Sequence, residues 1–155
     1  MSLSQAQQIE QQLQQALARN NEGDTKGALE LYDQVLAEDP SNPAALAYAG
    51  YLQWNVGTSA HVPSLARVGR SMIETAVRSS PTYYEAHLFY GLVLANEDHD
   101  NQAAVAQFGD FLADGPPAAE PVHVAALVAP AYQAAGVPLP AAFSTSSPGT
   151  TAPKG

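Results

Sequence analysis

The sequence predicts an all-α protein, and three observations support this fold class. Alanine, glutamine and leucine are abundant in this chain of 155 residues, of which 46% are hydrophobic, and these residue types lose little side-chain entropy in a helix. The β-branched runs that build sheets are nearly absent. Apolar residues also recur at helical spacing, as at Ile9, Leu13, Ala16 and Leu17, which lie on one helix face. One domain with a modest core is expected at this length.

The first two helices are expected between residues 4 and 40. Ser4 and Gln7 have the spacing of a capping box, in which two side chains satisfy free N–H groups at a helix start. A tight turn is expected at 21–25. Pro40 ends the second helix, because proline lacks an N–H donor and clashes with the preceding turn.

The helical pattern then repeats along the chain. Five pairs of residues are related by a shift of 41 positions: Ala28 and Gly69, Pro40 and Pro81, Ala45 and Ala86, Gly50 and Gly91, and Asn55 and Asn96. Small residues at such positions let two helices approach closely, so the pattern indicates stacked helix–turn–helix pairs. An insertion at 58–68 either lengthens the second pair or forms a short extra turn.

This pattern resembles the tetratricopeptide repeat (TPR). The first copy carries the resemblance at Gly23-Asp24, Ala28, Tyr32 and Asp39-Pro40. The resemblance covers about residues 5 to 117. It implies a right-handed superhelix, or α-solenoid, of about three helix–turn–helix pairs at 5–40, 43–81 and 83–116. Three larger side chains are expected to fill the space between neighbouring pairs: Tyr32, Ile73 and Phe108.

A capping helix is expected over about 120–135, because the end of a solenoid exposes an apolar face that needs cover. Val124, Leu127, Val128 and Ala131 share one face of this helix. Pro130 is expected to kink the helix or to divide it into two pieces. The repeat domain then spans 4–136, and residues 137–155, rich in proline, alanine, serine and threonine, form a disordered tail.

The net charge of −9, from 6 basic and 15 acidic residues, argues against nucleic acid as a partner. Phosphate binding requires clustered lysine and arginine, whereas the basic residues here are scattered. The same charge opposes an anionic membrane surface. No stretch approaches the ~20 apolar residues that span a bilayer, so no membrane insertion is expected. A protein or peptide partner is therefore predicted.

No catalytic, cofactor or metal site is expected, and the chain is predicted not to be an enzyme. It has no cysteine, and its four histidines lack the helical spacing of metal ligands. The acidic run at 97–101 lacks the ligand pattern and central glycine of a calcium loop, which favours a solvated turn. Serine-nucleophile motifs and phosphate-binding glycine loops are also missing.

The resemblance implies a binding groove on the concave face, formed by the first helix of each pair. The residues expected to face this groove are Leu13, Leu17, Asn20, Asn21, Ala47, Tyr51, Trp54, Asn55, Leu88, Leu92, Ala95 and Asn96. Tyr51 is the stronger candidate for a binding anchor, while Trp54 lies either in the groove or in the core.

Asparagine recurs at the same place in each of these helices, at Asn21, Asn55 and Asn96. An amide both donates and accepts hydrogen bonds, so these side chains could hold a peptide backbone. Asparagine is also typical of helix C-termini, which gives a purely structural alternative. The predicted groove is apolar with amides, and it favours an apolar or helical segment of a partner protein.

Two alternatives to a simple binding module remain. The repeat pattern is also similar to bacterial repeat domains of c-type cytochrome biogenesis factors. That resemblance implies the soluble part of a membrane-anchored assembly factor, located outside the cytoplasm; a complete chain is expected in the cytoplasm. The other alternative is a self-associating scaffold, a homodimer formed through an exposed end of the solenoid.

Overall fold

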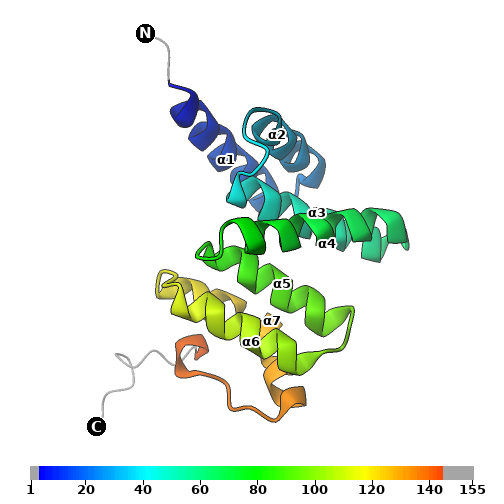
Figure 1. Cartoon of the computed structure of the whole chain (residues 1–155), viewed down its shortest axis with the longest axis vertical. Helices are drawn as coiled ribbons and strands as arrows, with labels where there is room; N and C mark the ends of the chain where they lie inside the picture. The colour runs from blue at the N-terminus through cyan, green and yellow to red at the C-terminus, as the bar shows by residue number, and fades with distance from the viewer. Residues whose placement is uncertain (1–3, 145–155) are drawn as a thin grey trace.

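The computed structural model describes residues 4–144, which form seven α-helices and one 3-10 helix (Figure 1). The elements are α1 (Gln5–Asn21), α2 (Thr25–Glu38), α3 (Pro43–Ser59), α4 (Pro63–Ser79), α5 (Tyr84–Asn96), α6 (Asn101–Ala113), α7 (Ala119–Ala135) and the 3-10 helix η1 (Ala141–Phe143). No strand occurs among these described residues. The predicted all-α fold class is confirmed.

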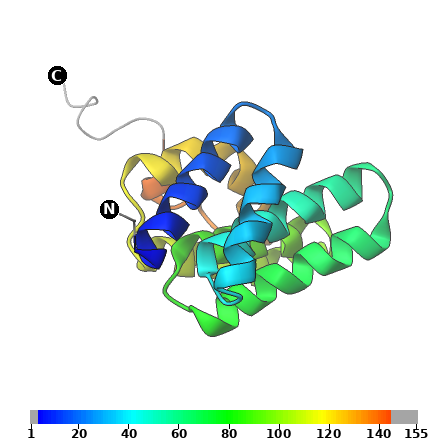
Figure 2. The same ribbon diagram turned by 90° about the horizontal axis from the view of Figure 1, so that it is seen from above.

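The helices pack as consecutive pairs that follow one another along the molecule. α1 packs on α2, α3 on α4 and α5 on α6, and each pair then contacts the next (Figures 1 and 2). α7 packs against α6 and α5 and covers the last pair. This arrangement is the α-solenoid of three helix pairs with a C-terminal cap that the sequence predicts.

Local capping signals fix where the helices begin. The Ser4 hydroxyl accepts the Gln7 N–H at 3.2 Å, and the Gln7 side chain accepts the Ser4 N–H at 3.0 Å, which confirms the predicted capping box. Asp24, Asn42 and Asp100 cap α2, α3 and α6 in the same way, with one side-chain oxygen each. These oxygens satisfy N–H groups that have no partner inside the helix.

Glycine allows the backbones of α3 and α4 to touch. A Cβ atom on Gly50 would lie 2.7 Å from the Gly69 carbonyl oxygen, and one on Gly69 would lie 2.4 Å from the Gly50 carbonyl oxygen. The obstacles are backbone atoms, so neither position accepts a side chain unless the helices separate. In the next pair, a Cβ on Gly91 would lie 2.4 Å from the Phe108 ring. The predicted close approach at small residues is confirmed.

Large side chains fill the space between the pairs as predicted. Tyr32, Ile73 and Phe108 are 1%, 0% and 0% exposed, respectively. Most buried residues form one continuous core from the second pair to the C-terminal cap. The first pair and the start of α3 form a smaller cluster of their own. The molecule therefore has two core clusters, joined at the second pair.

The insertion at 58–68 lengthens the second pair and adds no extended loop. α3 continues to Ser59 and α4 begins at Pro63, so that both helices have 17 residues. A Cβ on Gly57 would lie 2.4 Å from the Ala66 nitrogen, so the close helix contact extends into the added turns. In Figure 2 the far end of this pair (cyan to green) projects beyond the rest of the molecule.

The C-terminal cap differs in detail from the prediction. α7 is one helix that contains Pro130 and is not divided into two pieces. Val128 and Ala131 are buried on its inner face, but Leu127 is 56% exposed. The sequence prediction placed Leu127 on the inner face and is wrong there. Apolar spacing alone does not fix how a helix is rotated against its neighbours.

The prediction of a disordered tail from residue 137 is wrong for residues 137–144. Gly136 ends α7 with a left-handed backbone (φ 72°), and the chain then folds back to η1. The Phe143 ring is 0% exposed and lies 6.2 Å from the Phe111 ring and 5.8 Å from the Tyr132 ring. One buried aromatic ring thus anchors a segment whose composition is typical of disorder. Residues 145–155 of the predicted tail lie outside the described residues.

Candidate functional site

A groove of about 270 Å³ lies where α1 faces the starts of α3 and α5. Its lining residues are Glu10, Leu13, Gln14, Leu17, Tyr32, Ala44, Tyr48, Tyr83 and Glu85. α1 supplies the aliphatic wall, whereas α3 and the start of α5 supply tyrosines and a carboxylate. Apart from Tyr32 on α2 and Tyr83 at the α5 N-cap, the lining comes from the first helices of the three pairs.

Only part of the predicted groove lies in this space. Leu13 and Leu17 line it, and Leu17 is 40% exposed. Four other predicted groove residues belong to the core, with exposures of 0–5%: Ala47, Trp54, Leu88 and Leu92. The prediction of groove-facing positions is wrong for Ala47, Leu88 and Leu92, and Trp54 takes the core alternative. α3 and α5 are inner helices with neighbours on both sides, and eight of the 13 residues of α5 are buried.

Tyr51, the preferred anchor, lies one turn beyond Tyr48 on α3 and is half-buried. Its ring stacks on Phe89 at a centroid distance of 4.5 Å and on Trp54 at 6.0 Å. Burial raises the pKa of Tyr51, while a hydrogen bond with Asn55 acts in the opposite direction. Tyr51 is not among the residues that line the groove. Its ring mainly braces α3 against α5.

The predicted asparagines do not form a row of free amides. Asn21 and Asn96 are the last residues of α1 and α5, as the helix-end interpretation expects. The Asn96 side-chain amide donates to the Leu92 backbone carbonyl at 2.7 Å. Asn55 lies inside α3, because the lengthened helix continues past it.

The sequence interpretation missed a cluster of tyrosines around Glu85, at the floor of the groove. The Glu85 carboxylate accepts hydrogen bonds from the hydroxyls of Tyr48 and Tyr83, the latter at 2.9 Å. Tyr48 also stacks on Tyr32, with ring centroids 6.0 Å apart. Burial and the nearby Glu85 charge raise the pKa values of Tyr48 and Tyr83, so both hydroxyls stay protonated as donors.

A second carboxyl group, Glu120, lies next to Glu85. Glu120 is in the first turn of α7 and hydrogen-bonds with Glu85 and Tyr84. Burial and, to a smaller extent, the charge and hydrogen bond of Glu85 together raise the pKa of Glu120 to about 7, against the opposing effect of the Tyr84 hydrogen bond. Two like charges in hydrogen-bonding contact are unfavourable, so Glu120 keeps its proton to a higher pH than an isolated carboxyl group does.

Stability should therefore fall with rising pH through Glu120. Its folded pKa lies above the ordinary value of 4.5, so the stabilisation is fully present below that value and is lost as the pH rises through about 7. We expect the melting temperature to fall from about pH 5 to about pH 8 more steeply in the natural chain than in Glu120→Gln. Thermal melts followed by circular dichroism test this, and parallel curves for the two chains would contradict it.

No family model matches the chain, and no curated protein matches it. Among solved structures, the chain is similar to TTC0263, a thermophilic TPR protein of Thermus thermophilus. The identity is 20%, the alignment covers 83% of each chain, and the TM-score is 0.45. The resemblance to c-type cytochrome biogenesis factors stays a prediction.

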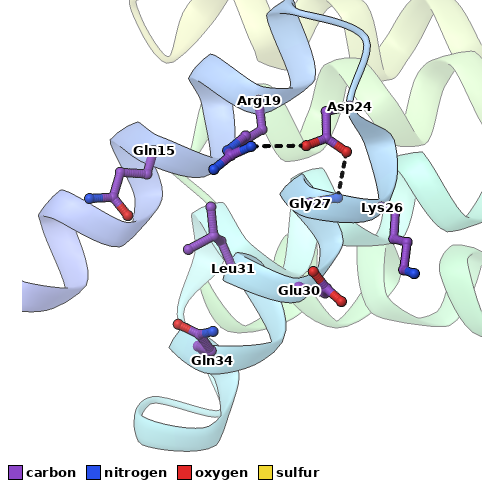
Figure 3. Close-up of a pocket in the computed structure, with 8 residues that line it drawn as sticks. All are labelled: Gln15, Arg19, Asp24, Lys26, Gly27, Glu30, Leu31 and Gln34. Carbon is purple, nitrogen blue, oxygen red and sulfur yellow. Dashed lines mark hydrogen bonds and ion pairs between the residues drawn. The ribbon is translucent and has the colours of Figure 1, made fainter.

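A second hollow of the solenoid, about 400 Å³, lies between α1 and α2 (Figure 3). Arg19 and Asp24 face each other across it and form an ion pair at 3.2 Å. Asp24 also accepts the Gly27 N–H at 2.9 Å, which caps α2. The central charges of this hollow are thus already paired, and they serve the α1–α2 turn. We therefore regard the groove beside α3 and α5 as the stronger candidate.

The acidic run at 97–101 serves the structure at the α5–α6 turn. Arg70 of α4 bonds Glu97 at 2.6 Å and Asp98 at 2.8 Å, and the Trp54 indole N–H donates to Glu97 at 3.1 Å. Asp100 caps α6. Hydrogen bonds from Arg70 lower the pKa of Asp98, so this carboxylate is held ionised and joins α4 to the α5–α6 turn.

Within residues 4–144, no group of three or more histidine, cysteine or acidic side chains is placed to hold a metal ion. His87 is buried, with its ring nitrogens 2.7 Å from the Gln107 side-chain oxygen and 2.6 Å from the Pro81 carbonyl oxygen. It connects α5 to α6 and to the preceding turn. No helix of the described chain is long and apolar enough to cross a membrane.

Proposed function

We propose that this chain is a non-catalytic protein-interaction module, which binds a short segment of a partner protein in the groove between α1, α3 and α5. The supporting observation is the exposed aliphatic wall of α1 opposite the tyrosines of α3 and α5. Leu17 is 40% exposed beside Leu13, and it faces a surface built from Tyr48 and Tyr83. Such apolar and aromatic surface with a few fixed polar groups is typical of binding sites.

The groove is open because α1 packs almost entirely on α2. Among the described helices, α1 has no extensive contact with α3 or α5, so the space between them stays free of protein side chains. The opposite wall is rigid: Tyr48 packs on Phe89 at 5.1 Å as well as on Tyr32. Tyrosines held in this way lose little conformational entropy when a ligand binds.

Leu17 provides the test of this proposal. Peptides are selected from a displayed random library on the natural chain, and their affinities are measured by fluorescence polarisation. We expect Leu17→Ser to weaken binding by about tenfold or more, roughly 1.4 kcal/mol, because it removes exposed aliphatic surface from the groove wall. Equal affinity for the natural chain and Leu17→Ser would contradict binding in the groove.

Val68→Ser is the matched control for this experiment. Val68 is 52% exposed on α4 and does not line the groove, so the substitution removes a similar aliphatic surface elsewhere. Substitutions at such exposed positions change stability little, typically within about 0.5 kcal/mol. We expect Val68→Ser to bind the selected peptides as the natural chain does.

Self-association through an exposed solenoid end has less support. α7 packs over the last pair, and the buried ring of Phe143 adds further cover at that end. The outer face of α1 is mostly glutamine and charged residues, which do not form the apolar patch that a stable dimer requires.

A further inference from the structure

We propose that the partner segment presents a lysine or arginine side chain, which binds between Glu10 and Glu85 over the tyrosine rings of the groove. Apolar residues beside this cation would contact Leu13 and Leu17. The inference rests on the peptide-binding function proposed above and specifies the chemistry of its ligand.

The first argument is charge complementarity. The residues that line the groove include two glutamates, Glu10 on α1 and Glu85 on α5, and no lysine, arginine or histidine. Within residues 4–144, no ion pair involves Glu10, Glu85 or Glu120. These carboxyl groups thus lack a cation from their own chain. A cationic side chain of a partner would supply one, and an acidic segment would be repelled.

The second argument is that the Glu85 carboxylate is held in place and can still accept a further hydrogen bond. The hydroxyls of Tyr48 and Tyr83 each donate to one of its two oxygens. An ionised carboxylate has about four lone-pair sites, and the hydrogen bond with Glu120 uses a third, so about one remains for a further donor. An ammonium or guanidinium group can use it without displacing the tyrosines, and the fixed carboxylate needs no reordering.

The third argument is the aromatic lining. Tyr48 and Tyr83 line the groove around Glu85, whereas Tyr32, which also lines it, is 1% exposed and stacks on Tyr48. The electron-rich face of a tyrosine ring attracts a cation placed above it. The aliphatic stem of lysine or arginine also suits the walls formed by Leu13 and Leu17. A basic side chain therefore matches both the apolar and the charged parts of this groove.

The carboxyl pair gives an independent signature of the bound cation. The titratable groups that interact with Glu120 are Glu85 and Tyr84 from α5 and Tyr48 from α3. A cation beside Glu85 also stabilises the ionised state of the neighbouring Glu120, so binding near neutral pH should release the proton that Glu120 retains. An uncharged ligand in the same groove has no such effect.

The test compares charged and uncharged versions of one peptide. A library-selected peptide is synthesised with its basic residue and again with norleucine for lysine or citrulline for arginine. We expect the uncharged version to bind the natural chain at least about tenfold more weakly. In Glu10→Gln and Glu85→Gln this difference should shrink to a few-fold. Glu10 is exposed on α1, so its substitution leaves the fold intact even if Glu85→Gln does not fold.

Glu30→Gln is the matched control, because Glu30 is an exposed glutamate that lines the other hollow between α1 and α2 (Figure 3). It should keep the full discrimination between the charged and uncharged peptides.

Calorimetry at neutral pH in two buffers of different ionisation enthalpy adds a second readout. We expect proton release with the natural chain and none with Glu120→Gln. No proton release with the natural chain would overturn the assignment of the cation to Glu85.

The outcomes separate this inference from the function on which it rests. Selected peptides that require Leu17 but lack a basic residue, or that tolerate norleucine or citrulline, would keep the groove function and overturn the cationic ligand. Failure to select any peptide that requires Leu17 would overturn both. Peptides that require Leu17, their basic residue and Glu10 together would support both.

Discussion

Replacing Gly69 by alanine is expected to lower the free energy of unfolding by about 2–3 kcal/mol. The added Cβ would lie 2.4 Å from the Gly50 carbonyl oxygen and 2.5 Å from the Trp54 nitrogen. Both are backbone atoms inside α3, so the clash is relieved only if α4 moves away from α3 along much of its length. Alanine favours helix over glycine by about 1 kcal/mol, which offsets only part of this cost.

Gly109→Ala is the matched control for Gly69→Ala. Gly109 lies inside α6, and a Cβ at this position would meet no heavy atom within 4 Å. The same substitution there should raise the free energy of unfolding by about 0.5–1 kcal/mol, because only the conformational entropy of the unfolded chain changes. Chemical denaturation followed by circular dichroism measures both variants. A stabilised Gly69→Ala would contradict the close contact between α3 and α4.

Replacing Phe143 by alanine is expected to cost about 3–4 kcal/mol. The ring is 0% exposed and packs against Phe111 and Tyr132, so its removal leaves a cavity between α6, α7 and the C-terminal segment. The remaining residues of that segment offer little to hold it, since Val137 and Leu139 are 37% and 40% exposed. The loss should therefore release the segment and uncover the inner face of α7.

Leu139→Ala serves as the comparison, since it shortens an exposed side chain of the same segment and should change stability by less than about 0.5 kcal/mol. Denaturation reports the global loss, and amide hydrogen exchange shows whether α7 loses protection first. Wild-type stability in Phe143→Ala would mean that residues 137–144 do not pack on the cap as described.

The helix pairs could be predicted because their signals are local. The Ser4 capping box, the tight turn at 21–25 and Pro40 each act within a short stretch of the chain, and small residues such as Gly50 and Gly91 recur at the same place in successive copies. The sequence left open whether the insertion at 58–68 lengthens the α3–α4 pair or forms a short extra turn. Its extra residues extend helices that already exist, so no separate turn signal marks them.

The candidate site could be predicted only in part. Leu13 and Leu17 line the groove because α1 is a terminal helix, with one face covered and the other open, and their role in binding stays a prediction. Trp54 and Leu92 lie on inner helices, where the next pair covers a second face. Which strip of such a helix stays open depends on its rotation against both neighbours, and apolar spacing does not encode that rotation.

The residues that the sequence interpretation missed depend on contacts between distant segments. Tyr48 and Glu85 are separated by 37 positions, and their hydrogen bond forms only once the second and third pairs are stacked. The adjacent residues Tyr83, Tyr84 and Glu85 were a visible signal at the start of a helix. Their shared role with Tyr48 could not be read from spacing, because it crosses the boundary between repeats.

The two core clusters have a consequence for the order in which the molecule opens. The first pair belongs mainly to the smaller cluster, which meets the larger one only at partly buried residues such as Leu36, Tyr48 and Met72. In a linear array each unit is held by its neighbours alone, so the first pair is the unit expected to fray most readily. One wall of the groove lies on that pair and the other on the main body. A ligand that contacts both walls of the groove would therefore stabilise the packing of the N-terminal pair on the rest of the solenoid and reduce its fraying.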